Sequence, residues 1–287
     1  MTIAVIMRVN DGLVLATDSA SSVTLLDEEG NEFVYHVYNH ADKIFNLKKE
    51  KSIACMTWGA GNLSDKSIST IAKDFRKEVM GNIKEFTVKE ISDEFKKYIK
   101  KIITDEDKDV GFIICGYSNK DEFEDIPEVY EIQYTNGELQ DPKLINEGQP
   151  IFINWYGEGQ YISRLVLGFD PLLDNIINEY DISEENIMEN IKNKLSLPLG
   201  VPSMPIQDAI EFVETLVYVT IQMSKFVPGA QTVGGEIDIA VITKHEEFKW
   251  IKRKHYYNKE LNPNDNRWYN GIQFMHSKFS KNNTSWS

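Results

Sequence analysis

The sequence predicts an α+β fold in which two stacked antiparallel sheets are flanked by helices, a four-layer αββα sandwich. The chain opens with two apolar, strand-like runs, residues 2–9 and 12–18, joined by the turn signal Asn10-Asp11-Gly12. Blocks of strand-like and helical segments then follow one another along the chain. Near the end, a long amphipathic helical stretch, residues 206–225, precedes a further apolar strand. Sheets and helices in this order bury their apolar faces best when stacked in layers.

The remaining elements follow from hydrophobic periodicity and turn signals. Residues 22–40 form a long hairpin-like excursion with an acidic tip, which we expect to cover a site or to meet a neighbouring subunit. Alternating or apolar runs predict strands over residues 41–47, 51–58, 110–117, 128–134 and 150–155, and a last strand after Gly234-Gly235. Helical spacing predicts helices over about residues 62–80, 87–103, 160–168, 183–194 and 206–225.

Length and composition indicate one globular domain with a tail. The 287 residues are 41% hydrophobic, and we place the domain over residues 1–244 and a basic, aromatic-rich extension over residues 245–287. No apolar run approaches the roughly 18 residues of a membrane span, so we expect a cytoplasmic protein without a membrane partner. A formal charge of −14 argues against nucleic acid as a partner.

The chain offers no recognisable cofactor or metal site. Its two cysteines, Cys55 and Cys115, both lie in apolar strand-like runs, where a free thiol behaves as a small hydrophobe. None of the five histidines has a zinc-ligand spacing, and no Gly-rich phosphate loop is present. We therefore expect no disulfide, no metal and no cofactor.

The candidate chemistry begins at Thr2. Removal of the initiator methionine would leave Thr2 with a hydroxyl and a free α-amine on the same residue. An α-amine has a reference pKa of roughly 7.7–8.0, so it keeps a neutral fraction that can take the hydroxyl proton. Thr2 would then carry both a nucleophile and its base.

Three further positions match the groups that such a nucleophile needs. Asp18 ends the strand that pairs with the one beginning at Thr2, and Lys43 begins a short alternating run. A carboxylate can hold the lysine, whose positive charge lowers neighbouring pKa values. Gly59, in Gly59-Ala60-Gly61 after an apolar strand, can present a free backbone N–H to an oxyanion.

The order of these motifs resembles proteasome β-subunits and the peptidase subunit of the related bacterial two-component protease. The resemblance is carried by Thr2, by Leu-Ala-Thr-Asp-Ser at residues 15–19, by Asp-Lys-Ile at residues 42–44, by Trp-Gly-Ala-Gly at residues 58–61 and by Gly-Gly before the last strand. It spans about residues 2–244 and implies the αββα fold of N-terminal nucleophile hydrolases.

The resemblance also implies roles for individual residues. The family's nucleophile falls on Thr2, its aspartate on Asp18, its lysine on Lys43 and its oxyanion-hole glycine on Gly59. Substrate-binding positions fall at the start of the excursion and on both sides of Gly59, and comprise Ser21, Ser22, Thr57 and Gly61. The chain departs from the family at Ala230, Val233 and Glu158, where other residues are usual.

From these residues we expect a threonine-type peptidase that cleaves peptide or unfolded protein substrates. The resemblance implies a homo-oligomeric ring and, if unfolding is driven by ATP, a separate unfoldase. Two alternatives stay open: a catalytically silent structural subunit with the same fold, and an N-terminal nucleophile amidohydrolase acting on a small amide.

Overall fold

The computed structural model of the protein describes residues 2–105, 107–120, 126–179, 187–199, 201–255 and 261. The chain divides into two compact units, Met1–Arg253 and Lys254–Ser287. Every helix and strand named below belongs to the first unit. Most of the aromatic-rich extension, and Met1, lie outside the described residues.

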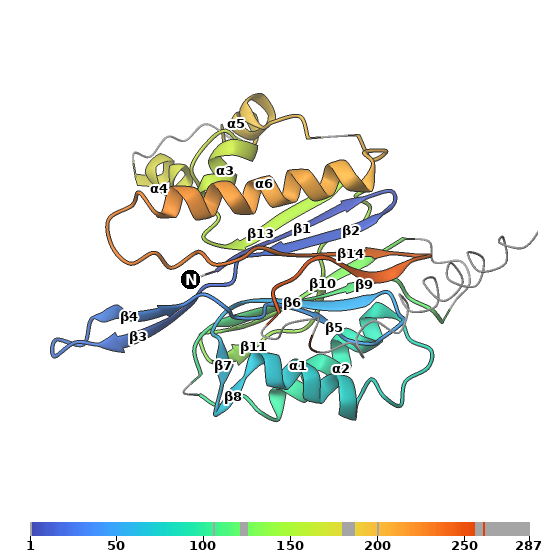
Figure 1. The fold of residues 1–287 in the computed structure, drawn as a ribbon. Coiled ribbons are helices and arrows are strands. Elements are labelled where there is room, and N and C mark those ends of the chain that lie inside the picture. The colour runs from blue at the N-terminus through green and yellow to red at the C-terminus, as the bar shows by residue number, and fades with distance from the viewer. Residues whose placement is uncertain are drawn as a thin grey trace, which may run out of the picture. The chain divides into compact units, whose positions relative to one another are not determined.

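A five-stranded antiparallel sheet carries both ends of the first unit (Figure 1). Its strands lie in the order β13-β1-β2-β14-β15. They comprise β1 (Ile3–Val9), β2 (Gly12–Thr17), β13 (Phe152–Gly157), β14 (Asp238–Thr243) and β15 (Glu247–Lys252). β1 and β2 are joined by the predicted turn, and every residue of both strands is buried. The N-terminal strand is thus central, so Thr2 is held beside the sheet rather than on a loose end.

A six-stranded antiparallel sheet forms below it. The main path runs β11-β10-β9-β6-β5, and β12 also pairs with β10. These strands are β5 (Ile44–Asn46), β6 (Ile53–Gly59), β9 (Val110–Gly116), β10 (Glu128–Thr135), β11 (Glu138–Leu139) and β12 (Lys143–Leu144). β6 and β9 are paired over their full length, from Ile53↔Gly116 to Gly59↔Val110.

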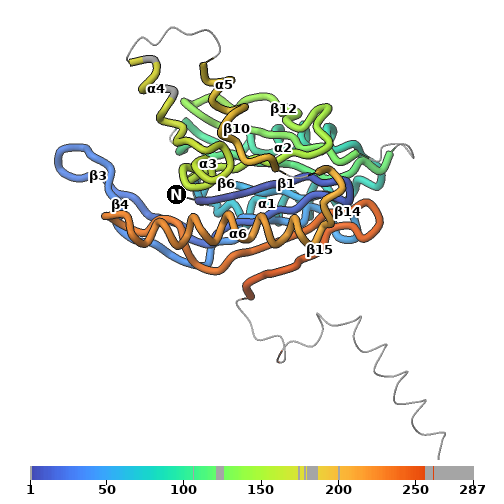
Figure 2. The backbone as a smooth tube through the Cα atoms, turned by 90° about the horizontal axis from the view of Figure 1, so that it is seen from above, coloured from blue at the N-terminus to red at the C-terminus, as the bar shows by residue number. Residues whose placement is uncertain are grey.

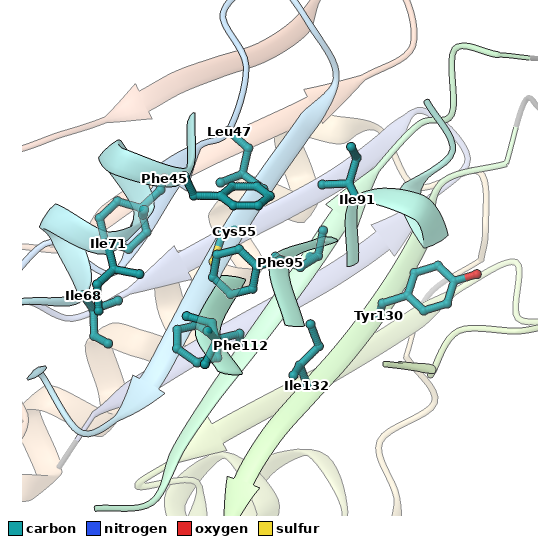
Figure 3. Close-up of a cluster of buried hydrophobic side chains, with 14 of the residues drawn as sticks. Phe45, Leu47, Cys55, Ile68, Ile71, Ile91, Phe95, Phe112, Tyr130 and Ile132 are labelled. Carbon is teal, nitrogen blue, oxygen red and sulfur yellow. The ribbon is translucent and has the colours of Figure 1, made fainter. Parts of the chain in front are cut away.

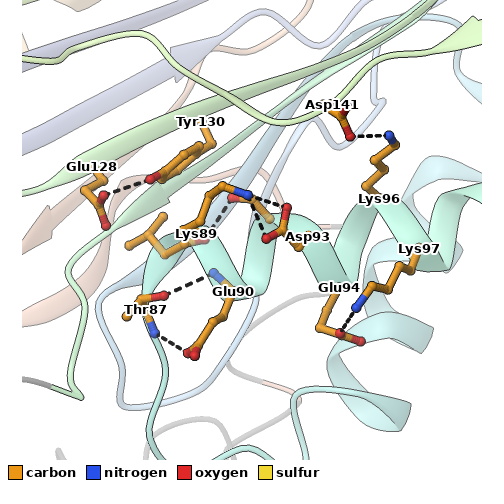
Figure 4. Close-up of polar contacts among 12 residues, drawn as sticks. Thr87, Lys89, Glu90, Asp93, Glu94, Lys96, Lys97, Glu128, Tyr130 and Asp141 are labelled. Carbon is orange, nitrogen blue, oxygen red and sulfur yellow. Dashed lines mark hydrogen bonds and ion pairs between the residues drawn. The ribbon is translucent and has the colours of Figure 1, made fainter.

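Two helices cover the outer face of the six-stranded sheet. They are α1 (Ile68–Glu78) and α2 (Val88–Lys100), which pack on it through a core with edge-on aromatic rings (Figure 3). The ring centroids of Phe75 and Phe95 lie 5.0 Å apart, and those of Phe95 and Phe112 lie 5.1 Å apart. α2 begins with a capping box in which Thr87 and Glu90 each accept the other's backbone N–H (Figure 4).

The long helix α6 (Ile206–Ser224) covers the outer face of the five-stranded sheet and packs on β1 and β2 (Figure 1). Its apolar face includes Ala209, Val213 and Val217, as the helical spacing predicts. Three shorter helices precede it: α3 (Gln160–Val166), α4 (Leu172–Glu179) and α5 (Ile187–Leu195). α4 was not expected, and residues 183–186 of the helix predicted over 183–194 lie outside the described residues.

A third core lies between the two large sheets. It joins Ile6 and Leu15 of the upper sheet to Met56 and Ile113 of the lower one, and all four are fully buried. Cys55 and Cys115 are free and buried, and burial raises the pKa of both thiols. Those thiols are therefore poor nucleophiles.

Two small sheets are separate from the large ones. β3 (Ser21–Leu26) and β4 (Glu32–Tyr38) form a two-stranded ribbon, which both views show projecting from the body of the unit (Figures 1 and 2). β7 (Asn62–Leu63) pairs with β8 (Lys66–Ser67).

The prediction of a four-layer sandwich built from two sheets is therefore wrong. The described residues form a sheet-rich α+β fold with four antiparallel sheets. The ribbon stands apart because its apolar side chains, including Leu25 and Phe33, are exposed instead of packed on either large sheet. Residues 62–67, expected as the first turns of a helix, pair as β7 and β8, and α1 starts only after the N-cap Ser67.

No helix in the described part of the chain combines the length and the apolar character needed to cross a bilayer.

Candidate active site

Thr2 lies at the start of β1 and is only 3% exposed. Its carbonyl oxygen accepts a hydrogen bond of 2.7 Å from the backbone N–H of Glu158. The neighbouring Gly157 has φ +83°, and a Cβ atom there would lie 1.8 Å from the Thr2 carbonyl oxygen. Only glycine allows this close approach, so β13 fixes the backbone of Thr2.

Asp18 follows β2 directly and is completely buried. Its Oδ1 accepts the N–H of Ile3 at 3.1 Å, next to Thr2 in the chain, and its Oδ2 accepts the N–H groups of Ala20 at 3.1 Å and Gly234 at 3.0 Å. Backbone donors to a carboxylate stabilise its charged form. The charge of Asp18 is thus held by three separate parts of the backbone.

Lys43 pairs with this carboxylate. Its Nζ lies 2.5 Å from Asp18 Oδ1, and the lysine is only 6% exposed. Lys43 directly precedes β5, and its carbonyl accepts the N–H of Thr57 on β6 at 3.0 Å. A buried ion pair gives little net stability, because both charges lose their water. Asp18 and Lys43 therefore form a buried ion pair, and its carboxylate binds the N–H of Ile3, the residue that follows Thr2.

Gly59 ends β6 with φ +87°, and a Cβ atom there would lie 2.5 Å from the carbonyl oxygen of Asp109. A side chain at this position would clash with the neighbouring backbone. Gly59 follows Thr57 by two residues, so β6 links it to the carbonyl of Lys43. The position requires glycine because the backbone of Asp109 lies so close to it.

The four predicted substrate-binding residues separate into two groups. Ser21 and Gly61 lie side by side, since Ser21 Oγ would be 3.2 Å from a Cβ atom at Gly61. Ser22 is the next residue of β3 and is half-buried. Thr57 instead is 4% exposed, and its Oγ1 donates to the carbonyl of Gly111 at 3.0 Å. Ser21 and Gly61 thus bring the start of β3 next to the segment after β6, and the Thr57 hydroxyl is engaged with the sheet.

Gly234 is a site residue that the sequence analysis did not assign. Besides its bond to Asp18, its carbonyl accepts the N–H of Ser19 at 2.8 Å, and Ser19 Oγ donates to the carbonyl of Glu236 at 2.5 Å. Gly235 has φ +75°, and a Cβ atom there would lie 2.5 Å from the Asn39 carbonyl oxygen. The only sequence signal for this support was the pair Gly234-Gly235 itself.

The positions that depart from the resemblance have structural partners. Val233 is fully buried in the core beneath α6, and its carbonyl accepts from Gln231 Nε2 at 3.0 Å. Glu158 directs its carboxylate to Gln160, whose Nε2 donates at 3.2 Å. Ala230 is exposed. Neither Ala230 nor Val233 has a side-chain hydroxyl or carboxylate to offer Thr2.

An aromatic pair joins the two large sheets next to Gly59. Trp58 on β6 stacks on Tyr156 on β13 with ring centroids 3.8 Å apart. Burial, and the nearby carboxylate of Glu131, raise the pKa of Tyr156 far above its usual range. Tyr156 therefore stays neutral and acts here as a packing group. Among the described residues, no three His, Cys, Asp or Glu side chains converge as metal ligands would.

Comparison with known proteins finds similarity only at the level of structure. No protein-family model matches the chain, and no curated protein matches its sequence. Among solved structures, the Anbu complex from Pseudomonas aeruginosa, described as a helical assembly, matches with a TM-score of 0.54 at 15% identity, over 96% of each chain. A Gly-1 mutant of Anbu from Hyphomicrobium sp. strain MC1 matches with a TM-score of 0.50 at 15% identity, over 97% of each chain.

These matches correct the resemblance read from the sequence. The two structures are of Anbu, a family distinct from the proteasome β-subunits and the bacterial peptidase subunit that the motifs suggested. At 15% identity the similarity concerns the fold alone.

Proposed function

We propose that this chain is an N-terminal threonine hydrolase that cleaves amide bonds of polypeptides after Met1 has been removed. The main support is the buried pair of Asp18 and Lys43, whose carboxylate also binds the N–H of Ile3, the residue that follows Thr2. The attraction between the two charges is largely offset by the loss of their water, so the pair adds little net stability. A buried charge pair that adds little stability favours a chemical role.

In the proposed reaction the Thr2 hydroxyl oxygen attacks the carbonyl carbon of the substrate. The α-amine of Thr2 takes the hydroxyl proton and later returns it to the leaving amine. Lys43 provides positive charge that favours the ionised oxygen, Asp18 holds Lys43, and the Gly59 N–H stabilises the oxyanion. Water then hydrolyses the acyl-enzyme ester and restores Thr2.

We further propose that the substrate is an extended polypeptide segment. It would add as a strand between the segment of Ser21 and Ser22 and the segment from Gly59 to Gly61, where backbone groups supply its hydrogen bonds. In support, Ser21 and Gly61 bring the start of β3 and the segment after β6 next to each other.

Self-association is part of this proposal. In the β3–β4 ribbon, residues directly opposite each other lie on the same face. The pairs Val23↔His36 and Leu25↔Phe33 therefore place three apolar side chains on one face of the ribbon. Each of these three side chains is at least 39% exposed. The other face is bound by Lys108, which contacts Thr24 and Glu32. An isolated two-stranded ribbon is marginally stable in water, so a second copy that covers the apolar face would stabilise it. The Anbu complex from Pseudomonas aeruginosa, of similar fold, forms a helical assembly.

A catalytically silent structural subunit is the competing function. Val233 favours it, because a buried valine at this position supplies no polar group to orient the Thr2 amine. An uncut Met1 would favour it too, since a blocked amine cannot act as the base.

The test is the intact mass of the purified protein before and after treatment with an epoxyketone or β-lactone probe. A hydrolase is expected to lack the mass of Met1 and to gain one adduct, and Thr2→Ala should gain none. Thr24→Ala, which changes a half-buried threonine on the ribbon, is the matched control and should label fully. A trimmed wild-type protein that does not label, or one that keeps Met1, would support the silent subunit instead.

A further inference from the structure

A second candidate site is a small cavity lined by residues of α1, by β5 and the residue Asp42 before it, and by a residue of β15 and Arg253. Its volume is about 70 Å³, more than twice the volume of a water molecule in the liquid, about 30 Å³. The cavity therefore has room for a small ion. Its polar lining comprises Asp42, Asn46, Lys73, Arg76 and Arg253.

Three positive side chains meet at this cavity. Lys73 and Arg76 are three residues apart on α1, so they share a face of the helix, and Arg253 follows β15 and lies over the ring of Trp250 at 4.7 Å. None of these three forms an ion pair with an acidic side chain of the described residues. Like charges that lie close together repel each other. The lining thus carries three positive charges against the single negative charge of Asp42.

Asn46 contributes two neutral oxygen atoms to this region, and one of them holds Arg76 in place. Arg76 Nη1 donates to the carbonyl of Asn46 at 3.4 Å, which holds the guanidinium against β5. The side-chain Oδ1 of Asn46 is buried and has no hydrogen-bond partner in the described part of the chain. A ligand that carries negative charge on several oxygens would compensate the three cations.

We propose that this cavity is a binding site for a phosphate-type oxyanion. Monohydrogen phosphate carries two negative charges and enough oxygens for three cationic donors. A carboxylate offers only two oxygens. Since Asp42 and Ile44 line the cavity and flank Lys43 in sequence, an ion bound here also fixes the strand that carries Lys43.

Calorimetric titration of the full chain with inorganic phosphate, at constant ionic strength set by chloride, tests the site. We expect saturable binding, with acetate at least about tenfold weaker because it lacks the second charge. Arg76→Gln, Lys73→Gln and Arg253→Gln should each weaken phosphate binding by about tenfold or more, the value of one hydrogen bond to a charged group. Lys77→Gln is the matched control: this lysine also lies on α1 but does not line the cavity, so it should bind as the wild type does.

Titration with phenyl phosphate separates two sources of the ligand. Equal binding would identify a phosphoryl group carried by a larger molecule, and exclusion of the ester would identify free phosphate.

Absence of saturable phosphate binding, or an equal loss in Lys77→Gln and Lys73→Gln, would overturn the site. If Arg76→Gln does not fold, the exposed Lys73 and Arg253 still decide the question. Thr2→Ala should bind phosphate unchanged, so failure of the proposed hydrolase and failure of this site are distinguishable.

Discussion

The carboxylate of Asp18 accepts hydrogen bonds from four donors, and each of them interacts with its negative charge. Asp18→Asn removes that charge and breaks the buried ion pair with Lys43. We expect the free energy of unfolding to fall by about 3–5 kcal/mol, as for other broken buried pairs. Denaturant unfolding monitored by circular dichroism measures it.

Asp93→Asn is the control for this prediction. Asp93 pairs with Lys89 at 2.6 Å on the surface of α2, so its loss should cost less than about 1 kcal/mol. Equal costs for the two variants would show that burial does not set the strength of the Asp18 pair.

The backbone beside Thr2 supports a second prediction. Gly157→Ala would place a Cβ atom 1.8 Å from the Thr2 carbonyl oxygen at φ +83°, whereas Gly137→Ala would meet nothing within 4 Å at a similar φ of +79°. Both variants carry the strain of a left-handed alanine, of order 1 kcal/mol. Thermal unfolding should therefore show a clearly larger loss for Gly157→Ala, and equal losses would mean that β13 does not fix Thr2.

At this scale the sequence predicted the side chains of the site better than its backbone. Thr2, Asp18 and Lys43 have side chains whose chemistry is visible in the residue type. The N–H of Gly234 has no such signature, because every residue except proline carries one. Its role depends on a loop folding back on Asp18 across 216 residues, which no local pattern reveals.

Elements with a long, regular pattern were predicted closely. The helix expected over residues 206–225 is α6, Ile206–Ser224, because its apolar side chains recur at helical spacing over five turns. α4, with eight residues, was missed, since two turns give too little periodicity to recognise. β7 and β8 have two residues each and replace the start of a predicted helix for the same reason.

The β3–β4 ribbon gives a prediction about association. Leu25→Thr combined with Phe33→Thr keeps residues that favour strands but removes the exposed apolar pair. We expect a lower sedimentation coefficient at a fixed protein concentration, with the circular dichroism spectrum unchanged.

Ile251→Thr, on the edge strand β15, also removes a half-exposed apolar side chain and is the control. An unchanged sedimentation coefficient in the double variant, or an equal change in Ile251→Thr, would exclude the ribbon as the main contact between copies.

The stability of the whole unit should depend on pH in the alkaline range. Burial raises the pKa of Tyr117 to about 12, against an ordinary value of 10.0, although Arg8 opposes the shift. The folded state thus favours the neutral phenol. Its stabilising effect is complete below about pH 10, the pKa in the unfolded chain, and is lost as the pH rises towards about 12.

Denaturant midpoints measured across this range check the sign. Stability should fall with rising pH, and Tyr117→Phe should make the fall shallower, because that variant has no phenol to ionise. Tyr35→Phe is the control, since Tyr35 is 66% exposed. Identical slopes for Tyr117→Phe and the wild type would contradict the prediction.

The arrangement of the sheets was the part that the sequence could not supply. Alternating residues predict that a segment is a strand, but the choice of neighbour depends on contacts far apart in the chain. β13 and β14 flank β1 and β2, although more than 130 residues separate them in sequence. The same limit applies to the ribbon, whose strands were recognised but whose separation from the large sheets was not.

The central place of the N-terminal strands ties the candidate site to the order of synthesis. Thr2 leaves the ribosome first, yet β2 gains its neighbour β14, and Asp18 its donor Gly234, only after those late residues have been made. A nascent or truncated chain therefore carries the threonine without the complete support of its charge pair. Thr2 would then become reactive only after synthesis of the whole chain, and a partly synthesised chain would not carry an active nucleophile.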